Sequence, residues 1–303
     1  MRGLLIFIAV VVSLAASPSG YIPPNRSEEN NRFPSLTEVK YGGISFQFDK
    51  ALVNEIKAKT VAASLFGKPC DLWPEHVAFS LVGYPRPRAV PPDFPQLRVF
   101  SVQRFRDAVE SGYRDYAQDT AYKAEESWTK DFDEEVRVLN ALLKTKPTQA
   151  TVQNFLKRIR HKEDFNQGMP FLPMWEAQQA FISHVKYVNF RNGRGVFFLT
   201  QWDTETSQIT NDGLEYAFQG ITDNGKHYVY AEFSVSTPRL PKGDEPAVIA
   251  WNETEYLLPR QSKKYQAYVR RVVAQLQSIR SDEFQPKLEL LERLISSLEV
   301  QSQ

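Results

Sequence analysis

The single cysteine and the four histidines are the residues of this sequence with the widest chemical range. Cys70 and His76 share one short stretch, and a thiolate nucleophile needs an imidazole within hydrogen-bonding reach. Closeness along the chain does not create that geometry, and a lone cysteine among Leu, Trp and Phe is typical of a small buried hydrophobic residue. We therefore expect Cys70 to be a packing residue, and we assign no catalytic residue.

Carboxylates and histidines of the second half could supply acid–base chemistry. Asp203 and Glu205 occupy alternate positions, which places both on one face of a strand, whereas a glycosidase needs a carboxyl pair across a cleft. His184 and His227 lie in strand-like segments, where a hydrogen-bonded structural histidine is the simpler interpretation. A divergent extracytoplasmic hydrolase is the alternative function, and it requires several of these four side chains to converge in one pocket.

Motifs for common cofactors and metals are absent. Gly193-Arg194-Gly195 begins like a dinucleotide-binding loop, but Phe198 stands where the third glycine belongs. The sequence has no phosphate-binding Gly-Lys-Ser/Thr and no Gly-x-Ser-x-Gly nucleophile turn. The histidines never pair at zinc-ligand spacing. We expect no cofactor and no metal site.

Aromatic and arginine side chains give the one positive indication of a site. Tyr228 and Tyr230 lie opposite the apolar face of their strand, and Arg191 and Arg194 flank an Asn-Gly pair. Tyrosine and arginine are favoured at interfaces. We predict that Arg191, Arg194, Tyr228 and Tyr230 form a candidate binding surface. The alternative is that helices cover this face of the sheet and make the tyrosines part of the core.

Charge and composition exclude several classes of protein. The 303 residues carry 37 basic and 36 acidic side chains, a formal net charge of +1, so no long-range field attracts a phosphate backbone. We therefore expect no nucleic-acid partner. A hydrophobic content of 42% is typical of an ordinary folding chain rather than of a disordered or multi-span membrane protein.

The N-terminus has the features of a secretory signal peptide. Arg2 precedes an apolar run from Leu4 to Val12, which is too short to span a bilayer comfortably. Small residues follow, and Pro18 ends the pattern. We predict a signal peptide at 1–17, export to the periplasm or the medium, and no membrane span after cleavage. An uncleaved anchor is the alternative.

The mature chain is predicted to begin with a flexible tether at 18–39, because this stretch is rich in Pro, Asn and Glu and poor in apolar residues. Strand patterning follows in four segments, which are Ile44 to Phe48, Thr60 to Ala63, His76 to Val82 and Leu97 to Val102. Residues 103–160 instead show helical spacing of Val, Leu, Phe and Ile. We expect a helical segment there.

The segment 169–238 predicts an antiparallel meander of four strands. Three turn signals containing glycine separate its apolar stretches, and the Asn192-Gly193 pair favours a hairpin because both residues accept positive φ. In the last strand, Val229 and Phe233 belong to one face, while Tyr228, Tyr230 and Glu232 lie on or near the other.

Two helices are predicted after Glu255, with apolar stripes at spacings of three and four residues. The fold class is thus α+β, with an antiparallel sheet flanked by helices and a C-terminal helical hairpin. We expect one sandwich domain at 40–255, onto which the hairpin at 256–303 packs. A dimerising coiled coil is the alternative for these helices.

Several segments resemble an exported bacterial protein family of unknown function. They are Pro170-Phe171-Leu172-Pro173 with Ala177 and Gln179, Asn192 to Val196 with Thr200-Gln201, and Leu214 to Gly220 through Tyr228-Val229. The sheet flanked by helices also resembles the PsbP/Mog1 type of α+β sandwich. These resemblances imply a fold and an exported location, and they assign no catalytic residue.

The sequence therefore favours an exported, non-enzymatic binding or envelope-associated protein. Its partner is an unidentified protein, envelope component or small ligand. With a single cysteine, the chain forms no internal disulfide, so its stability must come from core packing.

Export can be tested at the N-terminus. If the signal peptide is cleaved, mass spectrometry of the protein from its native host will find a mature N-terminus between Ala16 and Ser19. Recovery of the intact N-terminus from the membrane fraction would favour an anchor instead.

Overall fold

The computed structural model describes residues 36–65, 72–85, 95–119, 128–160, 168–172, 177–255 and 258–301. The chain divides into two units, Met1–Pro34 and Ser35–Gln303, and the described residues all belong to the second. The predicted signal peptide, most of the predicted tether, and Cys70 lie outside the described residues.

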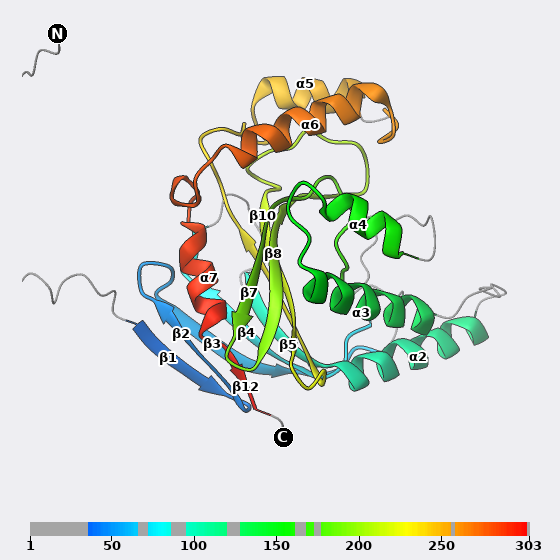
Figure 1. Ribbon diagram of the computed structural model, residues 1–303, viewed down its shortest axis with the longest axis vertical. Coiled ribbons are helices and arrows are strands. Elements are labelled where there is room, and N and C mark those ends of the chain that lie inside the picture. Colours follow the sequence, from blue (N-terminus) through cyan, green and yellow to red (C-terminus); the bar gives the residue numbers. More distant parts are fainter. Residues whose placement is uncertain are drawn as a thin grey trace, which may run out of the picture. The chain divides into compact units, whose positions relative to one another are not determined.

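A seven-stranded antiparallel sheet forms the centre of the fold (Figure 1). Its strands, in spatial order, are β3 (Glu55–Val61), β4 (His76–Val82), β5 (Gln96–Ser101), β11 (His227–Ser234), β10 (Glu215–Thr222), β8 (Gly193–Thr200) and β7 (Ser183–Phe190). The four strands β7, β8, β10 and β11 pair in sequence order, with tight turns from β7 to β8 and from β10 to β11 and a longer connection, residues 201–214, from β8 to β10. The predicted meander is confirmed.

Two smaller sheets complete the strands. One has the order β1 (Leu36–Tyr41), β2 (Ile44–Asp49) and β12 (Glu299–Val300), and the other pairs β6 (Gln178–Gln179) with β9 (Trp202–Asp203). Strand β1 begins inside the segment predicted as a tether, so the boundary at residue 39 is wrong. It is an edge strand with mostly exposed side chains, and its hydrophilic composition therefore does not reveal that it pairs with β2.

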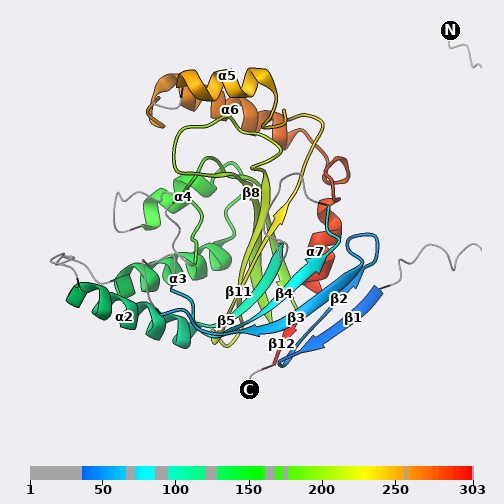
Figure 2. The ribbon, with the colours of Figure 1, turned by 180° about the vertical axis from the view of Figure 1, so that it is seen from behind.

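Helices lie on both sides of the large sheet (Figures 1 and 2). One side carries α2 (Val102–Asp119), α3 (Trp128–Thr145) and α4 (Val152–Ile159), as predicted for 103–160. The later helices are α5 (Pro246–Glu255), α6 (Lys263–Gln277) and α7 (Leu288–Ser296), with a 3₁₀ turn at Ser281–Glu283. The α+β class with C-terminal helices is confirmed.

The C-terminal helices pack on different neighbours. Helix α6 lies beside α5, where the rings of Trp251 and Tyr268 are 5.5 Å apart, while α7 packs against β2 and β7. No sequence pattern predicted α5, in which Val248 is the buried residue. A helix with so little buried surface has no apolar stripe to identify it.

Both faces of the large sheet are buried along its central strands β8, β10 and β11, whereas the edge strand β3 is largely exposed. Alternate side chains of the central strands point to opposite faces, so Val229 and Phe233 join a core formed with β2, α6 and α7. Tyr228 and Tyr230 join a second core formed with α2, α3 and α4. The predicted division of β11 into two faces is confirmed, and both faces belong to the interior.

The hairpin between β7 and β8 differs from its prediction in one respect. The connecting residues are Arg191 and Asn192, while Gly193 already pairs with Phe190 as the first residue of β8. A Cβ atom on Gly193 would lie 2.1 Å from the Phe190 ring and 2.6 Å from the Ile221 carbonyl oxygen. The glycine is therefore needed for close packing rather than for a positive φ.

Packing of α7 can be tested with one substitution. Leu291 has no exposed surface, so we expect Leu291→Ala to lower the free energy of unfolding by about 2–5 kcal/mol. The control, Ile249→Ala on α5, removes a side chain that is 46% exposed and should change stability by less than about 0.5 kcal/mol. Urea denaturation measures both, and equal small effects would contradict the docking of α7.

Candidate functional site

The predicted surface of two arginines and two tyrosines does not exist as one exposed patch. Tyr228 and Tyr230 are each 1% exposed, beneath the layer that includes α2, α3 and α4. The Tyr228 hydroxyl donates to the carbonyl oxygen of Leu172 at 2.9 Å and to Gln219 at 3.0 Å. The prediction of exposed tyrosines is therefore wrong, and the alternative, a face covered by helices, is what the structure contains.

Arg191 holds the C-terminal strand. Its guanidinium pairs with Glu299 at 3.0 Å, and its backbone N–H donates to the Leu298 carbonyl oxygen at 2.9 Å. The neighbouring Asn192 side chain brackets the backbone of Val300, donating to its carbonyl oxygen at 2.5 Å and accepting from its N–H at 3.1 Å. The tip of the hairpin thus anchors β12.

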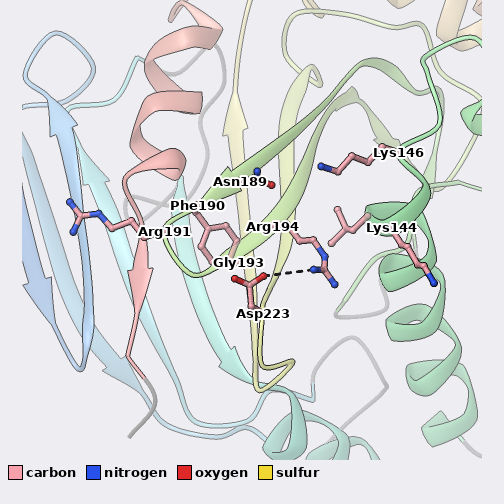
Figure 3. Close-up of a pocket in the computed structure, with 9 residues that line it drawn as sticks. Lys144, Lys146, Asn189, Phe190, Arg191, Gly193, Arg194 and Asp223 are labelled. Atoms are coloured by element: carbon pink, nitrogen blue, oxygen red, sulfur yellow. Dashed lines mark ion pairs between the residues drawn. The ribbon is translucent and has the colours of Figure 1, made fainter.

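A basic pocket lies beside this hairpin, with a volume of about 720 Å³ (Figure 3). Its charged lining consists of Lys144, Lys146, Arg191 and Arg194, with Asp223 as the carboxylate. In Figure 3, Lys146 points from the end of α3 toward the strands, whereas Arg191 points away toward β12. We name this site the basic pocket.

The backbone at the end of α3 positions the two lysines. Lys146 adopts a left-handed conformation with φ of 50°, and its N–H donates to the Leu142 carbonyl oxygen at 2.8 Å. This geometry closes the helix, and cations near a helix C-terminus are stabilised by its dipole. Within the described residues, Lys144 and Lys146 make no ion pair, while Arg194 lies 3.7 Å from Asp223. Figure 3 shows the Lys146 ammonium directed toward the strands, whereas the Lys144 side chain extends away from them.

A second cluster of polar side chains lies on the face of the sheet that carries Tyr230. Glu215 on β10 and Glu232 on β11 are diagonal neighbours, because Ala217 pairs with Glu232 and Glu215 pairs with Ser234. Arg98 on β5 pairs directly with Tyr230. The Arg98 guanidinium donates to Gln96 at 2.8 Å and lies 4.8 Å from the ring centre of Trp73. We name Glu215, Glu232, Tyr230 and Arg98 the carboxyl cluster.

The segment 168–172 closes over the carboxyl cluster. The Gln179 side chain accepts from the N–H of Met169 at 2.9 Å and donates to its carbonyl oxygen at 3.0 Å. Glu135 accepts from the N–H of Phe171 at 2.9 Å and pairs with Arg160 at 2.6 Å, both carboxylate and guanidinium being largely buried. This clamp holds the Phe171 ring 5.4 Å from that of Tyr230.

Burial controls the protonation of the carboxyl cluster. Desolvation raises the pKa of Glu232, which is 3% exposed, although nearby Tyr230, Glu215, Arg98 and Trp202 oppose the rise. Desolvation also raises the pKa of Tyr230, and the adjacent Glu232 adds to that rise. The carboxyl of Glu232 therefore keeps its proton to a higher pH than an exposed glutamate does.

The four acid–base candidates of the sequence analysis lie in separate places. His184 follows Ser183, the first residue of β7, which the strand pairing places at the level of Phe233. Phe233 is six residues along β11 from His227, roughly 20 Å at the rise of a strand. Burial lowers the pKa of both imidazoles. The backbone carbonyl oxygens of Asp203 and Glu205 accept from Arg260, before α6. The convergence that the predicted hydrolase requires is absent among these four residues.

Neither family models, curated proteins nor solved structures give a match to this chain. Within the described residues, no group of three or more His, Cys, Asp or Glu side chains is arranged to hold a metal ion. No described helix is both long and apolar enough to cross a bilayer. The two candidate sites therefore rest on their geometry.

The protonation of Glu232 has a consequence for stability. A carboxyl whose pKa is raised by folding binds more protons in the native state, so its contribution lowers the free energy of unfolding as pH rises from the ordinary glutamate range to the raised value. Glu232→Gln should weaken that decline by up to about 1.4 kcal/mol per pH unit. Urea unfolding at several pH values measures it, with the exposed Glu205→Gln as control. The same pH dependence in wild type and Glu232→Gln would contradict a raised pKa for Glu232.

Proposed function

We propose that this protein is an exported, non-enzymatic binding protein that captures an anionic group of its ligand or partner in the basic pocket. The carrying observation is that Lys144, Lys146 and Arg194 line one cavity beside the β7–β8 hairpin, with the Lys146 side chain directed toward the strands (Figure 3). The ligand group is a phosphate, sulfate or carboxylate, because these anions match ammonium and guanidinium donors.

The charge balance supports this proposal. Four cationic side chains and one carboxylate line the basic pocket, although the whole chain carries a formal net charge of only +1. Arg191 forms an ion pair with Glu299, and Arg194 forms a longer one with Asp223, so an acidic partner offsets each arginine charge. The two lysines supply the uncompensated charge that attracts an anion at short range.

The export part of the proposal rests on the N-terminal sequence. A basic residue, a short apolar run and small residues precede Pro18. The resemblance of segments 169–241 to an exported bacterial family supports the same location. A single cysteine agrees with a fold that depends on packing rather than on disulfides.

Anion capture is tested by titrating the full chain with inorganic pyrophosphate in a calorimeter. We expect saturable binding, weakened about tenfold in the double variant Lys146→Asn/Arg194→Gln, since each charge contact at an exposed site contributes up to about 1 kcal/mol. Asparagine at position 146 is chosen because it tolerates the left-handed backbone.

The matched control is Lys130→Gln, which removes an exposed cation at the other end of the same helix. Its affinity for pyrophosphate should equal that of wild type. High salt should weaken the binding of both proteins, because the sites are exposed. Failure of wild type to bind, or equal binding by the double variant, would reject the basic pocket as the site.

A further inference from the structure

A second cavity lies at the end of the large sheet where β5 leads into α2 (Figure 1), and it shares no lining residue with the basic pocket. Its volume is about 600 Å³, within the range of about 300–1,000 Å³ that is ordinary for small-molecule sites. Its lining comes from strands of the large sheet, from the first turn of α2, and from β2, β12 and the turn between β1 and β2. We name it the sheet-end pocket.

One part of the lining of the sheet-end pocket is apolar. Val77 pairs directly with Val99, so both side chains lie on one face of the large sheet. Ile44 pairs directly with Val300 in the small sheet. All four side chains belong to, or pack against, the core between the two sheets. An alkyl or aryl group of a ligand can therefore leave water by contacting them.

The charged part of the lining carries more positive than negative charge. Arg104 in the first turn of α2 and Lys226 before β11 supply two cations, and Glu75 supplies one carboxylate. Arg104 pairs with Glu75 at 3.0 Å. Lys226 is exposed and makes no ion pair with any residue that the structure describes. Lys226 therefore supplies the uncompensated charge of this pocket.

The first turn of α2 adds to this positive potential. The N–H groups at the start of a helix carry partial positive charge, which carboxylates in the first turn commonly offset. The first turn of α2 contains no acidic residue, and Arg104 places a further cation there. An anion bound in the sheet-end pocket would therefore be stabilised by the helix end as well as by Lys226.

His227 supplies a hydrogen-bonding group to the same lining. It pairs directly with Ser101 across β11 and β5, which places both side chains on the face of the sheet that carries Val99. The ring nitrogen Nδ1 of His227 is buried and makes no hydrogen bond within the described part of the chain. Buried polar atoms are nearly always satisfied, so this nitrogen calls for a partner. Rotation of the imidazole toward the cavity would give a ligand this nitrogen without breaking a hydrogen bond that it makes.

We propose that the sheet-end pocket binds a small organic acid, with its carboxylate beside Lys226 and His227 and its apolar body against the paired valines. Ammonium and imidazole N–H groups are suitable donors to the two oxygens of a carboxylate. Burial of an alkyl or aryl group against the valines supplies the remaining affinity. This inference does not depend on the basic pocket.

Other ligand classes fit the sheet-end pocket less well. An organic cation would lie beside Lys226 and Arg104, which repel it. A fully apolar ligand would displace water from the Lys226 ammonium and the His227 ring without replacing its hydrogen bonds. An inorganic anion would gain nothing from the apolar lining. A carboxylate attached to an apolar chain uses both parts of the pocket.

The test is isothermal titration of the full chain with octanoate, and with octan-1-ol and octylamine as ligands of the same chain length. We expect saturable binding of octanoate, at least tenfold weaker binding of the alcohol, and no saturable binding of the amine. The double variant Lys226→Gln/His227→Phe should weaken octanoate binding at least tenfold, because it removes both groups beside the carboxylate. Lys226→Gln alone changes an exposed residue, so it keeps the test valid if the double variant fails to fold, and it should weaken binding about fivefold.

Two further variants serve as controls. Lys59→Gln removes an exposed cation that pairs with Ala78, on the face of the sheet opposite to Val77, so it should bind octanoate like wild type. The basic-pocket variant Lys146→Asn/Arg194→Gln should also bind octanoate like wild type, which separates the two proposals. Thermal melting of each variant verifies that the protein titrated is folded.

Four results would overturn the proposal. They are failure of octanoate to bind wild type at millimolar concentration, equal affinity for octanoate and octan-1-ol, unchanged octanoate binding by folded Lys226 and His227 variants, and loss of octanoate binding in the basic-pocket variant. The last result would place the acid in the basic pocket instead of the sheet-end pocket.

Discussion

Burial of both faces of the central strands of the seven-stranded sheet is the constraint on which the rest of the structure depends. Strands β8, β10 and β11 are buried along almost their whole length, so a polar side chain on either face must find a partner or lose its charge. Tyr228 meets this demand by donating to Leu172, and Tyr216 by donating to Glu292 at 2.9 Å. For Glu232, the same burial raises the pKa of the carboxyl.

The same constraint explains why distant parts of the chain must come together. Helix α7 covers one face, and its Glu292 accepts from Lys186 of β7 at 2.5 Å as well as from Tyr216 of β10. Strand β12 then pairs with β2 and is held by the tip of the β7–β8 hairpin. The basic pocket lies beside this hairpin, so the contacts that close the fold also fix the position of Arg194.

Local patterns predicted local structure well. Alternation assigned Val229 and Tyr230 to opposite faces of β11, and glycine-containing turns located the meander. Whether helices cover a face of the sheet depends on contacts between residues far apart in the sequence. No residue near Tyr228 or Tyr230 indicates that α2, α3 and α4 bury them. The edge strand β1 was missed for the converse reason, since an exposed strand has no apolar pattern.

The candidate sites were predicted only in part. The sequence predicted the β7–β8 hairpin and singled out Arg194, and both border the basic pocket. Lys144 and Lys146 lie at the end of α3, and no local sequence pattern places that helix end beside the hairpin. Glu215 and Glu232 belong to different strands, and their proximity depends on the register of β10 against β11. The one indication of this cluster in the sequence is that Glu232 falls on the same face of its strand as Tyr228 and Tyr230.

The central claim is that burial inside the sheet raises the pKa of Glu232. Infrared spectroscopy of the folded protein over a series of pH values tests it most directly, because a protonated carboxyl has a carbonyl band separate from that of a carboxylate. The account predicts that wild type keeps a protonated carboxyl band to a higher pH than an ordinary glutamate does, and that Glu232→Gln removes this component. Loss of the band within the ordinary glutamate range, or a pH series that Glu232→Gln leaves unchanged, would contradict the account.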